Sequence, residues 1–158
     1  LNLITKAATV LFQTAIKTKF AIRGAIALGN MVFDEKNELV FGQALVDAYL
    51  LEEQLKFYGI VFHGNTEHII KKAKEEKCFS SKYPIRDQAV PLKEGLANHY
   101  HVTWFDIKEN LSMGNIHTNA KKWIEELRNT VTGNPRIYLD NTLKLIEYNP
   151  PTTAQTNS

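Results

Sequence analysis

The chain has 158 residues, of which 44% are hydrophobic and 23% charged, and its formal net charge is +2. These values are typical of one globular domain with a hydrophobic core, and they argue against a strongly basic surface for nucleic acid or anionic membrane. No apolar run approaches membrane-spanning length, and the first 20 residues lack the pattern of a secretory signal. We therefore expect neither nucleic acid nor a membrane as a partner.

The cysteine content gives a weaker indication of the compartment. Cys78 is the only cysteine, so an internal disulfide is impossible. Disulfide-free chains suit reducing surroundings, and we expect a cytoplasmic protein.

Hydrophobic periodicity predicts the elements in chain order. In the first half we expect helices over residues 2–17, 43–57 and 67–77, strands over 22–28 and 58–63, and a hairpin whose polar turn is 34–38. In the second half we expect strands over 89–92 and 100–105 and helices over 120–130 and 136–148. The polar, proline-containing segment 149–158 is expected to be a disordered tail, which leaves 1–148 as the folded domain. This order predicts an α+β or α/β sandwich, one sheet with helices packed on it.

The strand predicted over 22–28 has an unusual composition. Its bulky residues alternate with three alanines that surround Arg23. Small residues allow another element to approach closely, and a guanidinium among them needs an anion or a helix surface. Two interpretations stay open from the pattern alone: Arg23 pairs with a carboxylate of the protein, Asp47 or Glu52, or it binds phosphate.

The helix predicted over 43–57 is apolar on two sides. One stripe consists of Ala44, Ala48, Leu51 and Leu55. Val46 and Leu50 add apolar surface to a second side, next to Asp47 and Tyr49. Such a helix is either sandwiched between other elements or lies at a subunit contact.

Common catalytic signatures are absent from the sequence: it has no phosphate-binding loop, no nucleophile elbow, no H-E-x-x-H and no C-x-x-C pair. His99 and His101 lie two residues apart on a predicted strand, so they share a face and could begin a metal site. We favour a polar strand face, because no third ligand is near in the sequence.

Two segments resemble a known family. R-G-A-I-A-L-G (residues 23–29), then a hairpin, then F-G-Q-A-L-V-D-A-Y-L-L-E (41–52) is similar to the second half of the class III nucleotidyl cyclase catalytic domain. The chain is most similar to a divergent bacterial branch that includes the pyrimidine cyclases of antiphage defence. Residues 135–148, P-R-I-Y-L-D-N-T-L-K-L-I-E-Y, also resemble that branch.

The resemblance implies a ferredoxin-like core, acting as a head-to-tail homodimer with active sites between the subunits. It implies that a ribonucleoside triphosphate, with UTP and CTP as candidates, is cyclised to a 3′,5′-cyclic monophosphate with release of pyrophosphate. It also implies that the product is a second messenger in antiphage defence. Two Mg²⁺ or Mn²⁺ ions would assist. Arg23 matches the family arginine that holds the terminal phosphates, and Asp47 and Tyr49 are candidates for contacts with the base or ribose.

The chain also departs from the family pattern. The two metal-binding aspartates of the family precede the helix at residues 2–17, so we expect them upstream, in roughly 60 to 90 further residues, and no residue here inherits the metal role. Val46 and Leu50 occupy the positions of the family's transition-state asparagine and arginine. The alternative is therefore a degenerate cyclase-like module that binds a nucleotide or mediates dimerisation without catalysis.

Overall fold

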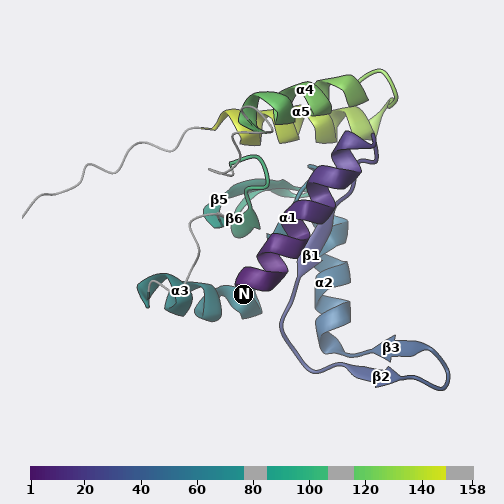
Figure 1. The fold of residues 1–158 in the computed structure, drawn as a ribbon, viewed down its shortest axis with the longest axis vertical. Helices are drawn as coiled ribbons and strands as arrows, with labels where there is room; N and C mark the ends of the chain where they lie inside the picture. Colours follow the sequence, from purple (N-terminus) through teal and green to yellow (C-terminus); the bar gives the residue numbers. More distant parts are fainter. Residues whose placement is uncertain (77–84, 107–115, 149–158) are drawn as a thin grey trace, which may run out of the picture.

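A computed structural model of the chain describes residues 1–76, 85–106 and 116–148. Cys78 and the expected tail at 149–158 lie outside these ranges. The elements are α1 (Asn2–Lys17), β1 (Gly24–Ile26), β2 (Val32–Asp34), β3 (Leu39–Phe41), α2 (Gln43–Gln54), β4 (Ile60–Phe62), the 3₁₀ turn η1 (Gly64–Thr66), α3 (Glu67–Glu75), β5 (Ile85–Leu92), β6 (Gly95–Val102), α4 (Ile116–Leu127) and α5 (Asn134–Glu147) (Figure 1).

The described strands form one mixed sheet and one separate hairpin. The four-stranded sheet has the order β1-β4-β6-β5, in which β1 is parallel to β4 and the other neighbours are antiparallel. Strands β2 and β3 pair only with each other. With helices packed on the sheet, this architecture confirms the predicted α+β class.

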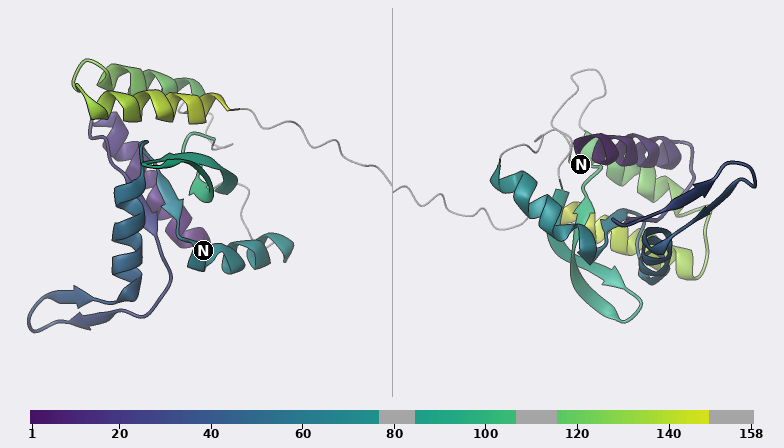
Figure 2. Two further views of the ribbon diagram at one scale, coloured as in Figure 1. Left: turned by 180° about the vertical axis from the view of Figure 1, so that it is seen from behind. Right: turned by 90° about the horizontal axis from the view of Figure 1, so that it is seen from below.

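Strand β4 divides the hydrophobic interior into two cores, because successive side chains of a strand point to opposite faces. Ile60 and Phe62 belong to the larger core, which includes residues of α1, α3, α4 and α5. Val61 belongs to a smaller core with residues of α2, β5 and α5. Figures 1 and 2 show α1 in front of the sheet in one view and α2 in front in the reverse view, so the two helices cover opposite faces.

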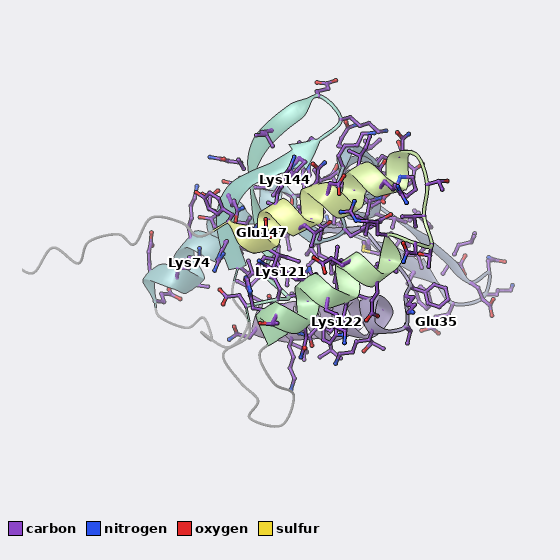
Figure 3. The ribbon with its side chains drawn as sticks, turned by 90° about the horizontal axis from the view of Figure 1, so that it is seen from above. Glu35, Lys74, Lys121, Lys122, Lys144 and Glu147 are labelled. Atoms are coloured by element: carbon purple, nitrogen blue, oxygen red, sulfur yellow. The ribbon has the colours of Figure 1, made fainter. Side chains whose placement is uncertain are left out.

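Helices α4 and α5 lie side by side on the body of the protein. They are the last two described helices and form a helical hairpin. Pro135 lies in the first turn of α5, where the missing N–H of proline is tolerated. Lys121 of α4 and Glu147 of α5 form an ion pair of 3.2 Å between them (Figure 3). The pair is partly exposed, so packing of Ile124, Leu139 and their neighbours contributes more to the contact.

Several predicted boundaries were wrong, for identifiable reasons. The helix predicted over 43–57 ends at Gln54, because Leu55 is extended and forms an isolated bridge with Leu92. The strand predicted over 89–92 begins earlier, at Ile85, and the strand predicted over 100–105 lies instead at Gly95–Val102. Both differences arise because β5 and β6 pair continuously from Ile85↔Val102 to Leu92↔Gly95. The strand predicted over 22–28 is reduced to three residues, because pairing with β4 extends only over Gly24–Ile26.

Gly42 allows the close approach that forms the base of the β2–β3 hairpin. A Cβ atom at this position would clash with the carbonyl oxygen of Asn30 and lie 2.8 Å from the Cα atom of Met31. We expect Gly42→Ala to lower the free energy of unfolding by more than about 1 kcal/mol, measured by chemical denaturation. Gly64→Ala is the control, because no atom lies within 4 Å of its added Cβ. Equal stability of the two variants would contradict this account of the hairpin base.

Candidate functional site

The site predicted from sequence is centred on the alanine-rich face of β1. Helix α2 packs on this face: Ala25 contacts the smaller core, which contains Leu51 and Leu55. A Cβ added to Gly29 would lie 3.2 Å from the Cβ of Ala44, at the other end of the helix. The prediction that small residues permit a close approach is therefore confirmed, and the element that approaches is α2.

Arg23 is held by groups of the protein itself. Its Nη2 atom lies 2.8 Å from Oε1 of Glu52, and its Nη1 donates a hydrogen bond of 2.8 Å to the carbonyl oxygen of Leu55. The guanidinium carbon lies 5.3 Å from the centre of the Tyr138 ring, within the range of a cation–π contact. Of the two carboxylates considered from sequence, Glu52 is the partner, and its charge balances that of Arg23.

Arg23 also lines a groove of about 430 Å³ between β1 and α1. The other lining residues are apolar or glycine: Ile4, Ala7, Ala8, Leu11, Ile22, Gly24, Ala25, Ile26 and Ile60. The side chains of Arg23 and Glu52 are 24% and 26% exposed, so water reaches the ion pair. Among the residues that the structure describes, Arg23 is the one charged residue in the lining of this groove, and its charge there is balanced by Glu52.

Asp47 lies at the opposite end of β1 from Arg23. Its Oδ1 accepts a 2.7 Å hydrogen bond from Gln43, and its Oδ2 a 3.3 Å hydrogen bond from Nδ2 of Asn65. The same Asn65 amide binds both the N–H and the carbonyl oxygen of Leu28. With a rise of about 3.3 Å per strand residue, Leu28 lies roughly 16 Å from Arg23 along an extended chain.

Tyr49 is exposed to solvent on α2. Its hydroxyl donates a 3.2 Å hydrogen bond to Glu53 one helical turn later, and that bond to a carboxylate raises the pKa of Tyr49. The structure therefore places Arg23, Asp47 and Tyr49 on one strand–helix unit but does not gather them around one point. A ligand that touched all three would have to be extended along β1 and α2.

Asn65 contacts this strand–helix unit, and the sequence did not indicate this contact. Asn65 lies in η1, immediately before the helix predicted to begin at residue 67. The contacts of Asn65 with Leu28 and Asp47 join segments 37 and 18 residues apart. No local pattern specifies such a tertiary contact, so this side chain could not be found without the fold.

The histidines on β6 do not start a metal site in the described part of the chain. His101 is 2% exposed, and its Nε2 lies 3.3 Å from Oε1 of Gln88 on β5. Within residues 1–76, 85–106 and 116–148, no group of three His, Cys, Asp or Glu side chains could hold a metal ion. The described residues therefore offer no fit for the Mg²⁺ or Mn²⁺ ions that the resemblance implies.

Comparisons with known proteins give no assignment. No family model matches the chain, and no match was found among curated proteins or solved structures. Among the helices of the described ranges, none is both long and apolar enough to cross a membrane.

Proposed function

We propose that this chain forms part of a nucleotide cyclase that converts a ribonucleoside triphosphate, with UTP and CTP as candidates, to a 3′,5′-cyclic monophosphate and pyrophosphate. The observation that carries the proposal is Arg23. Of the described residues that line the groove along β1, it is the charged one, and its strand leads through a hairpin to a helix packed on the alanine-rich face. We further propose that the cyclase acts in the cytoplasm, as a homodimer, in antiphage signalling.

The chemistry proposed for this site requires positive charge beside the leaving group. The ribose 3′-oxygen bonds to the α-phosphorus, the bond from that phosphorus to the bridging oxygen breaks, and the hydroxyl proton passes to solvent. Arg23 would bind the terminal phosphates, where the planar guanidinium can form paired charge-assisted hydrogen bonds. The triphosphate would compete with Glu52 for the guanidinium, and the partial exposure of this pair leaves it open to such exchange.

Mg²⁺ or Mn²⁺ belongs to the proposal through the resemblance alone. Such ions commonly assist phosphoryl transfer by binding phosphate oxygens. The described residues contain no group of side chains suited to hold such an ion.

A second candidate function is favoured by specific observations. Arg23 is already neutralised by Glu52, and Val46 and Leu50, where the family has its transition-state asparagine and arginine, are exposed apolar side chains. These features suit a degenerate module that binds a nucleotide or dimerises without turnover. In that case a triphosphate could bind without any cyclic product.

The experiment is to incubate the intact gene product with each of the four ribonucleoside triphosphates and Mg²⁺ or Mn²⁺, and to measure cyclic product by mass spectrometry. We expect product from at least one nucleotide. In Arg23→Ala the rate of product formation should fall by about 100-fold or more, because the phosphates lose a charge-assisted contact that strengthens as negative charge develops on the leaving pyrophosphate. Arg128→Ala is a matched control, since Arg128 is a partly exposed arginine paired with Asp140 at 2.6 Å in the α4–α5 hairpin.

Absence of product from every nucleotide would reject the cyclase. Calorimetry with non-hydrolysable triphosphates then separates the remaining possibilities. Binding lost in Arg23→Ala supports the degenerate nucleotide-binding module. No binding, with Arg23→Ala changing only stability, supports a purely structural role for the Arg23–Glu52 pair.

A further inference from the structure

Strand β5 lies at one edge of the described sheet, and its outer side is only partly covered. It pairs with β6 on the inner side. On the outer side, residues 54–56 run beside its carboxyl end, where the N–H of Lys56 donates a 3.0 Å hydrogen bond to the carbonyl oxygen of Pro91. The outer edge of β5 is therefore covered at this end by the chain itself.

Toward the amino end of β5, the same edge presents backbone groups without a partner among the described residues. Alternate residues of an antiparallel strand direct their N–H and C=O groups to the same side. Because the carbonyl group of Pro91 points away from β6, those of Ala89 and Asp87 do so as well. No described residue forms a hydrogen bond with the outward N–H or C=O of Ala89. Ala89 thus offers a donor and an acceptor together, which one residue of an added strand would satisfy.

A cavity of about 370 Å³ lies along this open stretch, between β5 and α5. Strand β5 lines it from both faces, with Gln88 on one face and Ala89 and Pro91 on the other, so the cavity runs along the edge of the strand. Helix α5 contributes Lys144 and Tyr148 from the opposite side. A mostly apolar lining with a few polar side chains, at this volume, is typical of a ligand-binding site.

Lys144 gives the cavity a positive charge. It is exposed, lies in the last turn of α5, and forms no ion pair within the described part of the chain. Two acidic side chains of neighbouring elements interact with other cations: Glu147 pairs with Lys121, and the charge of Asp87 interacts with that of Lys74. Figure 3 shows Lys144 on the side of α5 next to the β5–β6 hairpin. A carboxylate is the group that complements this end of the cavity.

We propose that the open stretch of β5 binds an extended, acidic peptide segment of another protein, which joins the sheet as an additional strand and places a carboxylate beside Lys144. In strand addition, main-chain hydrogen bonds provide affinity and side-chain pockets provide specificity. Ala89 supplies the main-chain groups here, and the cavity holds the side chains of the peptide. A small carboxylate would use the N–H of Ala89 but leave its carbonyl group unpaired. The proposal does not depend on cyclase activity.

Two other occupants fit this edge less well. In a second copy of the chain, antiparallel pairing centred on Ala89 would set Asp87 of each β5 against Pro91 of the other, where Lys56 is already bound. Residues 149–158 include two prolines and no acidic side chain, so they lack both a full set of N–H groups and a side-chain carboxylate for Lys144.

The first test is hydrogen exchange at the backbone N–H of Ala89, measured by NMR on the purified chain. We expect this N–H to exchange freely without a peptide, because it has no hydrogen-bond partner. Protection that grows with protein concentration would assign the edge to a second copy. Protection that is independent of concentration would assign it to another segment of this chain. Either form of protection would overturn the proposal.

The second test is selection from a displayed library of random nonapeptides on the immobilised chain. We expect enrichment of peptides that contain Asp or Glu and bind in the micromolar range. In excess, such a peptide should slow the exchange of the Ala89 N–H by at least about 10-fold, because the bound state protects it. The proposal is wrong if no peptide is enriched above an unrelated bait protein, or if the enriched peptides leave this exchange unchanged.

Substitutions separate the backbone contact from the charge. Ala89→Pro removes the outward N–H but no bond to β6, and Pro91 already occupies the next outward position, so we expect peptide affinity to fall by about 10-fold or more. Lys144→Gln should also weaken binding by about 10-fold. Lys122→Gln, an exposed lysine of α4, is the matched control and should bind as the wild type does (Figure 3).

Methylation of the peptide's amide nitrogens, one at a time, tests the same pairing without altering the protein. Binding should be lost for at least one position, because the methyl group removes the donor that faces the carbonyl oxygen of Ala89. Tolerance of every methyl group, or wild-type affinity in a folded Ala89→Pro or Lys144→Gln variant, would refute strand addition at this edge.

Discussion

Phe12→Ala should be among the most destabilising single substitutions in this chain, with a loss of about 3 to 5 kcal/mol in the free energy of unfolding. Phe12 lies at the centre of the larger core, with no exposed surface, and its ring centre is 4.8 Å from that of Trp104. Truncation removes buried apolar area and leaves a cavity that neighbouring side chains fill only in part. Urea denaturation measures the loss, which should lower the melting temperature by on the order of 10 °C.

Leu11→Ala provides the matched control for this prediction. Leu11 is the preceding residue of α1, but it is 61% exposed and faces the groove beside β1. Its truncation should change the free energy of unfolding by less than about 0.5 kcal/mol. Comparable losses in both variants would mean that α1 packs on the sheet through a different side.

Acid should destabilise the protein through His101 before most carboxylates are protonated. Burial, and secondly the charge of Arg86, lower the pKa of His101 from 6.5 to about 4. The unfolded chain therefore binds this proton more tightly than the folded one. The stability contributed by the neutral ring is complete above about pH 6.5, falls as the pH decreases, and is lost by about pH 4, a total of about 3 kcal/mol.

The measurement is the free energy of unfolding of the wild type and His101→Gln between pH 7 and pH 4. The variant can be less stable overall, but its loss between these two pH values should be smaller by about 3 kcal/mol, because glutamine does not titrate. His68→Gln, on the exposed side of α3, should keep the pH dependence of the wild type. Parallel curves for wild type and His101→Gln would show that the buried ring is not the acid-sensitive group.

Features governed by local periodicity were predictable from the sequence. The bounds predicted for the first helix coincide with those of α1, Asn2–Lys17, because its apolar spacing is regular and its last turn ends in a lysine. The hairpin followed from a polar turn between two apolar triplets. The buried stripe of α2 was also predicted, since Ala44 and Leu51 face the sheet.

The candidate site was predictable only in part. The pattern showed that Arg23 needed an anion, but Asp47 and Glu52 lie on the same helix and only the docking of α2 on β1 decides between them. Likewise, the separate position of the β2–β3 hairpin depends on the direction in which the chain leaves β1. Such choices are made by tertiary packing, which sequence periodicity does not encode.

The position of β1 at the margin of the sheet has a consequence for handling the protein. Its backbone is paired with β4 on one side, and the opposite row of amide and carbonyl groups borders the groove beneath α1. Gly24, Ala25 and Ile26 include no proline or charge, the features that commonly deter unwanted strand addition. Within the described residues, the shortness of this three-residue segment is what limits strand addition, so at high concentration β1 is one place where fibril-like growth of the sheet could begin.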